Sequence, residues 1–478
     1  MLVRASPARA NGRFPASNQI LFSPSVSPGD SSFVVARTTY AILPSRDNGA
    51  TWSYLCEDAL GLPSSAFQDP ALVVTASGAL VAGLATPTAG LDVSTDFGCT
   101  WSCAAGSLGQ QSIVDVAVRP DQPHVVVALT STYLAADAGG GTFAQVFQSP
   151  DDGASWTALG VPIDPTVRVQ TIDAAATDAH RLYVSGTRGF GASKVALLFA
   201  STDDGASWTE HALDAFDPGT EDSVYIGAVD PTDAARVYLR SSAVEAGGQS
   251  RLFITGDGGQ SFQVATRFEV PPPAGASLSV TGEILGFALS PEGSKVYAGT
   301  KEAGLFVASK ADLTFVKTSS IHVQCLATRG SELWACSDAV SGFVVGVSTD
   351  DGATFTAKLP TITSLAGPLA CGAEAGTSLA CGATANGSQC VDSFNLFCET
   401  DDVSGRCVGG EPRDSGSPDA GGAMGADAAV APAANAHDTS VSRSSCAFSA
   451  PGSEGSASGA ALCTVCAFAL RRRRLRRR

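Results

Sequence analysis

Three aspartates lie within or at the start of apolar, β-rich runs, where a carboxylate is unusual: Asp69, Asp115 and Asp173. Paired carboxylates serve glycoside hydrolases as acid, base or nucleophile, and carboxylate oxygens also bind cations such as calcium. An aspartate beside a turn can equally be structural, because its oxygens accept backbone N–H bonds. These three residues are the candidates for catalysis, provided that the fold brings them together.

A second group of charged residues lies at the ends of other β-rich runs or in the segments between them. It comprises Arg37, Arg188, Arg240, Lys301 and Asp222. Cations facing acids in this way are suited to binding a carboxylate or a sugar. The competing interpretation is ordinary surface charge, since ionisable groups are mostly exposed.

A recurring motif indicates the secondary-structure elements that must position these residues. We call the pattern Ser/Thr-x-Asp-x-Gly-x-Ser/Thr-aromatic the box. Its six near-complete copies contain Asp47, Asp96, Asp151, Asp203, Asp257 and Asp350. The one long interval between copies holds a degenerate box, Ser309–Phe315, which makes seven units. Glycine tolerates a positive φ and aspartate accepts backbone N–H bonds, so each box predicts a tight turn with a structural aspartate.

Three apolar runs precede each box, and short turns rich in Gly, Pro and Asp separate the first two. With one strand after the box, each unit becomes a four-stranded antiparallel sheet. Seven such sheets predict an all-β, seven-bladed β-propeller over residues 14–362. First strands would line its central channel and carry Asp115 and Asp173. Box turns would share one face with the turns between strands one and two, and the variable loops would lie on the opposite face, where binding sites usually occur.

The repeat resembles the Asp-box, or BNR, repeat proteins, which include sialidases, sortilin-type receptors and related exo-glycosidases. The resemblance implies the propeller fold and leaves the activity open. A sialidase would need a tyrosine nucleophile late in the chain. The last tyrosine here is Tyr297, at a repeat position that it shares with Tyr183 and Tyr238, so all three are expected in the core. This argues against a sialidase.

The composition favours an exported protein that does not bind nucleic acid. The chain has 46 Asp+Glu against 30 Lys+Arg and a formal charge of -16, which opposes contact with phosphate backbones. Thirteen cysteines without zinc-like spacing indicate disulfides formed in an oxidising compartment. Ala8-Arg9-Ala10 has the form of a signal-peptidase site, so residues 1–13 are interpreted as the remnant of a signal peptide and the mature N-terminus.

Beyond the propeller the composition changes three times. Residues 363–407 form a Cys-rich segment expected to be a disulfide-held appendage, and residues 408–444 have the composition of a flexible linker. Residues 445–478 contain Cys446, a short apolar stretch and terminal arginines. This tail resembles the MYXO-CTERM sorting signal of myxobacterial surface proteins. The resemblance implies export, cleavage near Cys446 and attachment to the outer surface.

The sequence therefore favours an exported, monomeric propeller that binds an extracellular glycan or protein without catalysis. It would contact a membrane only through its tail. No cofactor or metal is expected, although a structural cation such as calcium remains compatible with the acids. The alternative is a glycoside hydrolase that uses the channel carboxylates Asp69, Asp115 and Asp173.

Overall fold

The computed structural model describes residues 17–24, 32–60, 69–85, 90–104, 108, 111–133, 141–244, 248–270, 280–371 and 390. The chain divides into two units, Met1–Pro412 and Arg413–Arg478, and every described residue belongs to the first. Residues 1–13, the linker and the tail with Cys446 lie outside the described residues. Within the described ranges, no helix is long and apolar enough to cross a membrane.

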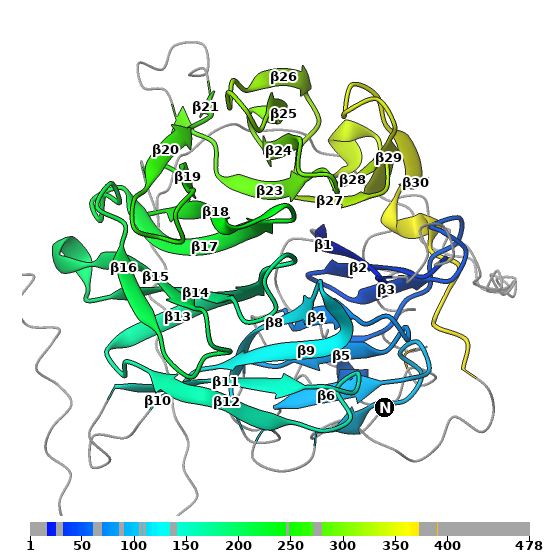
Figure 1. The fold of residues 1–478 in the computed structure, drawn as a ribbon. Coiled ribbons are helices and arrows are strands. Elements are labelled where there is room, and N and C mark those ends of the chain that lie inside the picture. The colour runs from blue at the N-terminus through cyan, green and yellow to red at the C-terminus, as the bar shows by residue number, and fades with distance from the viewer. Residues whose placement is uncertain are drawn as a thin grey trace, which may run out of the picture. The chain divides into compact units, whose positions relative to one another are not determined.

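Among the described residues, seven antiparallel sheets that form blades and one two-stranded sheet follow one another along the chain, and each is a contiguous segment of sequence (Figure 1). Blade 1 contains β1 (Ser17–Phe22), β2 (Val34–Thr38) and β3 (Ile42–Ser45). Blade 2 contains β4 (Ala71–Val74), β5 (Leu80–Gly83), β6 (Leu91–Ser94) and β7 (Ser102–Cys103). Blade 3 contains β8 (Ile113–Arg119), β9 (Gln122–Thr130), β10 (Thr132–Tyr133), β11 (Thr142–Ser149) and β12 (Thr157–Ile163). Blade 4 contains β13 (Val167–Ala174), β14 (Leu182–Arg188), β15 (Val195–Ser201) and β16 (Thr209–Ala212). Blade 5 contains β17 (Glu221–Asp230), β18 (Asp233–Ala243), β19 (Leu252–Thr255) and β20 (Gln263–Thr266).

Blade 6 contains β23 (Ile284–Leu289), β24 (Lys295–Thr300), β25 (Gly304–Ser309) and β26 (Val316–Ser319). Blade 7 contains β27 (Cys325–Arg329), β28 (Glu332–Cys336), β29 (Val345–Ser348) and β30 (Thr356–Leu359). A small hairpin, β21 (Glu269–Val270) with β22 (Val280–Thr281), precedes blade 6. The helical elements that can be delimited are short 3-10 turns: η1 (Glu57–Leu60), η4 (Gly191–Ser193), η5 (Ala339–Ser341) and η6 (Ile362–Ser364).

The first strands of neighbouring blades contact one another around the ring, in the order β1, β4, β8, β13, β17, β23, β27 and back to β1. These inner strands therefore line the central channel. Apolar side chains fill the space between adjacent sheets, and Tyr183, Tyr238 and Tyr297 are all buried there, as predicted. The predicted all-β, seven-bladed propeller of four-stranded antiparallel blades is confirmed. In blade 1, an isolated antiparallel bridge between Ile42 and Leu55 takes the place of the outer strand.

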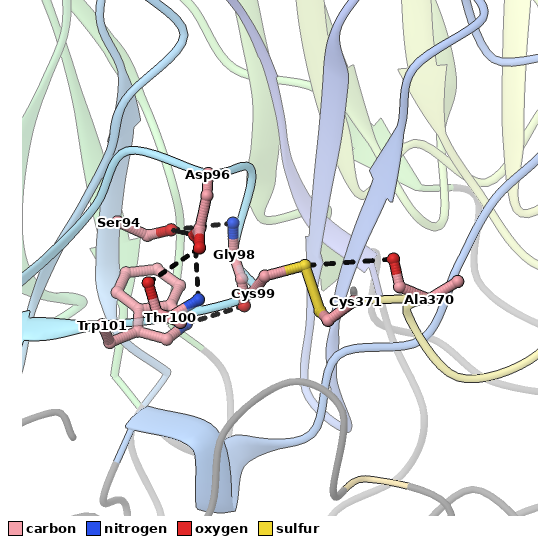
Figure 2. Close-up of a disulfide and its surroundings, with 8 residues drawn as sticks. All are labelled: Ser94, Asp96, Gly98, Cys99, Thr100, Trp101, Ala370 and Cys371. Atoms are coloured by element: carbon pink, nitrogen blue, oxygen red, sulfur yellow. Dashed lines mark hydrogen bonds between the residues drawn. A yellow bond between two sulfur atoms is a disulfide. The ribbon is translucent and has the colours of Figure 1, made fainter. Parts of the chain in front are cut away.

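Each near-complete box is a turn held by its own side chains, as the second box illustrates (Figure 2). Asp96 accepts hydrogen bonds from Ser94 Oγ, Thr100 N and Thr100 Oγ1 at 2.8, 2.8 and 2.7 Å. The chain reverses through two left-handed residues, Phe97 (φ 64) and Gly98 (φ 97). The degenerate box also turns in this way at Leu313 (φ 55), so its lack of glycine has not removed the reversal.

The box turns share a face with the turns between strands one and two. In blade 3, Asp152 N donates to His124 O at 2.9 Å, and in blade 4, Asp204 N donates to His180 O at 3.1 Å. The loops between strands two and three, and the segments linking the blades, lie at the other ends of the strands. We call that side the link face.

The segment after blade 7 returns to blades 1 and 2. Tyr54 N donates to Gly367 O and Leu369 N donates to Tyr54 O, both at 2.8 Å, so this segment adds a parallel pairing to the outer edge of blade 1. Two disulfides hold it there: Cys56–Cys390 and Cys99–Cys371 (Figure 2). Cys99 occupies a variable position within the second box. A third disulfide, Cys325–Cys336, joins β27 to β28, whose register places the two cysteines opposite each other.

Candidate functional site

Asp115 projects from β8 into the channel lining and binds the inner strand of the next blade. Its Oδ2 accepts from Ile172 N at 2.9 Å, and its Oδ1 accepts from Val116 N at 3.0 Å. Burial among the inner strands raises the pKa of Asp115 to about 7, and the carboxylate of Asp173 adds to this effect. The two backbone hydrogen bonds favour the ionised form and limit the rise. Asp115 therefore changes its charge near neutral pH.

Asp173 occupies the next inner strand, β13, and makes the same kind of contact one blade further on. Its Oδ2 accepts from Val229 N at 3.2 Å and its Oδ1 from Ala174 N at 2.8 Å. Burial raises the pKa of this carboxyl to about 6. Both predicted channel acids thus bridge adjacent blades, and they lie close enough to influence each other electrostatically.

Arg37, from blade 1, lies close enough to Asp115 to influence it electrostatically. Its guanidinium lowers the pKa of Asp115, so the two charges interact across the channel lining. Arg37 Nη1 also donates to Pro70 O, at 2.7 Å, at the start of blade 2. Asp69, the third predicted acid, directly precedes that proline and is half-buried.

A second charged group, in blades 5 and 6, contains one predicted residue and two that the sequence did not single out. Arg240 Nη1 donates to Ile284 O at 2.8 Å, and its guanidinium lies 5.3 Å from the ring centroid of Tyr225. Burial lowers the pKa of Arg240 and raises that of Glu283. Glu283 directly precedes an apolar inner strand, and Asp69 lies two residues before another, so an acid just before an inner strand was a usable signal.

The remaining predicted binding residues are held in other contacts. Arg188 binds both carboxylate oxygens of Glu210, at 2.7 and 2.6 Å, and also reaches Asp164 at 3.2 Å. Asp222 pairs with Lys194, which is the main reason that its pKa is lowered, and with Arg168. Lys301 lies in the turn between β24 and β25 and is half-buried.

Two aromatic side chains stand out on the link face. Tyr133 is 78% exposed and lies in the loop between strands two and three of blade 3, and Phe190 is 87% exposed in the corresponding loop of blade 4. They were not among the predicted site residues, although the sequence predicts variable loops on this face. A lone aromatic in a polar, Gly-rich loop was the available signal.

No group of three or more His, Cys, Asp or Glu side chains able to hold a metal ion occurs among the described residues. The channel acids Asp115 and Asp173 instead accept backbone N–H bonds on both of their oxygens. The fold and these contacts define a seven-bladed β-propeller with a charged channel lining and an aromatic-bearing link face.

Comparison with known proteins yields short or distant similarities, and no protein-family model matches the chain. A probable oligoxyloglucan-reducing end-specific xyloglucanase of Neosartorya fischeri is 31% identical over 149 residues, which cover 29% of this chain and 18% of that protein. A solved GH74 enzyme of Niastella koreensis is similar with a TM-score of 0.36 and 17% identity, over 73% of this chain and 66% of that one.

The GH74 xyloglucanase of Xanthomonas campestris is similar with a TM-score of 0.25 and 16% identity, over 76% of this chain and 58% of that one. The chain therefore spans under a fifth of the curated relative and no more than about two thirds of these two solved chains. A match of this extent supports similarity to part of a xyloglucanase and does not carry over that protein's whole activity.

Proposed function

We propose that this propeller binds a glycan on its link face, at and around the mouth of the channel. The observation that carries the proposal is that ionisable side chains from several blades form two groups on or beside the inner strands: Asp115 with Asp173 and Arg37, and Arg240 with Glu283. Sugars present many hydroxyl groups, and a rigid surface with convergent charged groups can orient them. The sequence match to a xyloglucanase supports a polysaccharide as the class of ligand.

Retention on immobilised glycans tests this proposal with the intact chain. We expect selective retention of the wild-type protein on a polysaccharide such as xyloglucan, and weaker retention after Arg37→Gln or Glu283→Gln. Asp178→Asn is a suitable control, because Asp178 lies beside His180 on the box face. Absence of retention on every glycan tested would remove the proposal.

Hydrolysis is the second candidate function, and the raised pKa values of Asp115 and Asp173 are the observation that favours it. A carboxyl that stays protonated near neutral pH can donate its proton to a glycosidic oxygen, while a second carboxylate activates water or attacks the sugar. The structure engages both carboxyls with backbone N–H groups, which is the contact expected of a structural role. We therefore rank binding before catalysis.

Release of reducing sugar from xyloglucan distinguishes the two candidates. Hydrolysis that falls at least a hundredfold in both Asp115→Asn and Asp173→Asn would establish the enzyme. No hydrolysis, together with retained binding, would leave the protein as a non-catalytic glycan-binding module. The variants must first show wild-type circular dichroism, because both acids also join blades.

We further propose that the protein is exported, monomeric and attached to the cell surface through its tail. The three described disulfides, Cys56–Cys390, Cys99–Cys371 and Cys325–Cys336, support an oxidising compartment. Protease treatment of intact cells tests this proposal, since a surface-attached propeller should be released into the medium. Release only after cell lysis would contradict it.

A further inference from the structure

Tyr133 and Phe190 lie on two sides of the segment that links blade 3 to blade 4. Tyr133 on β10 pairs with Thr142 on β11. Thr142 N donates to Pro165 O at 2.9 Å, and Thr142 Oγ1 donates to Val167 O at 2.8 Å. Val167 in turn pairs with Arg188, two residues before Phe190. A continuous set of backbone contacts therefore fixes the positions of the two aromatic residues relative to each other.

This contact path sets an upper limit on their separation. The path has three cross-strand steps of about 5–6 Å between Cα atoms, and two residues along the chain add about 7 Å, so the two Cα atoms are at most roughly 25 Å apart. At the largest separation, a single sugar ring cannot touch both aromatic rings. A chain of several sugars can.

The exposure of these rings needs an explanation, because large apolar side chains normally gain free energy from burial. Among the described residues, Tyr133 and Phe190 are the only aromatics in the group of exposed large hydrophobics, and the rest of that group are valines. The flat face of an aromatic ring is a good surface for the C–H face of a pyranose, and the polar groups nearby can bind hydroxyls. Thr132, beside Tyr133, is held by Gln111 Oε1 at 2.8 Å, and Arg188 is held by Glu210, so the polar neighbours of both rings are pre-positioned.

Charge limits the kind of glycan. The protein carries a formal charge of -16, and the guanidinium of Arg188, two residues before Phe190, is already paired with Glu210 and Asp164. A uronic acid or sulfated polymer would meet a repulsive surface. A neutral polysaccharide would not.

We propose that Tyr133 and Phe190 form a stacking platform for a neutral polysaccharide chain that lies across the link between blades 3 and 4. This proposal rests on the glycan-binding function above and adds the class of ligand and the place where it binds. The charged channel groups would then orient the chain, and the two rings would supply most of its affinity.

Titration calorimetry of the full chain with xyloglucan oligosaccharides, cello-oligosaccharides and polygalacturonate tests the platform. We expect Tyr133→Ala and Phe190→Ala each to raise the Kd for the neutral oligosaccharides about tenfold. Tyr133→Phe and Phe190→Tyr should keep the wild-type Kd, because they preserve the ring. All four substitutions are at exposed positions and should leave the Tm unchanged. Affinity should also increase with oligosaccharide length until a chain contacts both rings.

Val340→Ala is the matched control. Val340 is 79% exposed in the loop between strands two and three of blade 7, on the same face but away from the platform, and its removal should not change the Kd. Wild-type Kd in both alanine variants would overturn the platform while the binding function stands. Binding of polygalacturonate in preference to the neutral chains would overturn the class of ligand. A wild-type protein that binds no glycan would overturn the proposed function itself.

Discussion

Asp115 and Thr171 make the same hydrogen bond in successive blades. Asp115 Oδ2 accepts from Ile172 N at 2.9 Å, and Thr171 Oγ1 accepts from Ile226 N at 2.8 Å. The strand registers place the two residues at equivalent positions, opposite Leu129 and Ser185. A neutral hydroxyl therefore does in blade 4 what a carboxylate does in blade 3, which indicates that joining blades does not require the charge of Asp115.

This equivalence predicts the effect of two substitutions at position 115. Asp115→Thr should fold with near wild-type stability, because a hydroxyl can accept the bond from Ile172 N. Asp115→Ala should lower the free energy of unfolding by about 1–3 kcal/mol, since it leaves that N–H without its acceptor. Chemical denaturation monitored by tryptophan fluorescence measures both. Equal destabilisation by Thr and Ala would contradict the shared role.

The channel acids also predict how stability depends on pH. Burial raises the pKa of Asp115 to about 7 and of Asp173 to about 6, from an ordinary value of 3.8. Between pH 4 and 7 the folded protein thus holds protons that the unfolded chain has released, so these two residues make stability fall as the pH rises. Above pH 7 their effect is constant.

A double variant isolates this contribution. Ala117 and Ala228 occupy the positions equivalent to Asp173, so Asp173→Ala is the natural companion of Asp115→Thr. We expect the double variant to lose less stability than the wild type between pH 5 and 8, by about 1–3 kcal/mol after a discount for solvent screening. If stability depended on pH in the same way in the two proteins, the pKa values of the two acids would not be raised by folding.

The two long-range disulfides should contribute more to stability than the short one. Cys99–Cys371 and Cys56–Cys390 span 272 and 334 residues, whereas Cys325–Cys336 spans 11. Replacing the four long-range cysteines by Ser should lower the free energy of unfolding by about 2–5 kcal/mol, because the unfolded chain regains the entropy of large loops. The matched variant without Cys325–Cys336 should lose less. An equal loss, measured by denaturation without reductant, would show that loop size is not the main factor.

The box aspartates should affect stability and leave binding unchanged. Asp96→Ala removes the acceptor of three hydrogen bonds within one turn, and we expect it to lower the free energy of unfolding by about 1–3 kcal/mol. Thr95→Ala, at an exposed position of the same turn, is the control and should have little effect. Since the box turns lie opposite the link face, the Kd for a glycan should stay the same in both variants.

Much of the fold could be predicted because its signals are local. Six box aspartates at regular spacing are enough to count blades, and even the degenerate Ser309–Phe315 was recognisable from the gap that it fills. The β-rich runs that carry Cys325 and Cys336 are joined by a short turn, and the hairpin that they form places the two cysteines opposite each other. These inferences use only neighbouring residues, whose geometry the chain itself constrains.

The site was less predictable because it depends on contacts between distant segments. Spacing alone cannot show that Cys371 pairs with Cys99, since many connectivities suit the same set of cysteines. The sequence placed Asp115 on an inner strand, but not its bond to Ile172 in the next blade. The exposure of Tyr133 and Phe190 follows from loop conformation, which hydrophobic periodicity does not encode.

The disulfide-bonded segment after blade 7 also sets the order in which the molecule can be completed. Cys56 and Cys99 emerge from the ribosome hundreds of residues before Cys390 and Cys371, so neither thiol has its native partner while the blades are being made. During that interval the early thiols are able to pair with the wrong cysteines. Correct oxidation must therefore wait for the segment after the propeller, and any early mispaired disulfide has to be reshuffled late in the maturation of the protein.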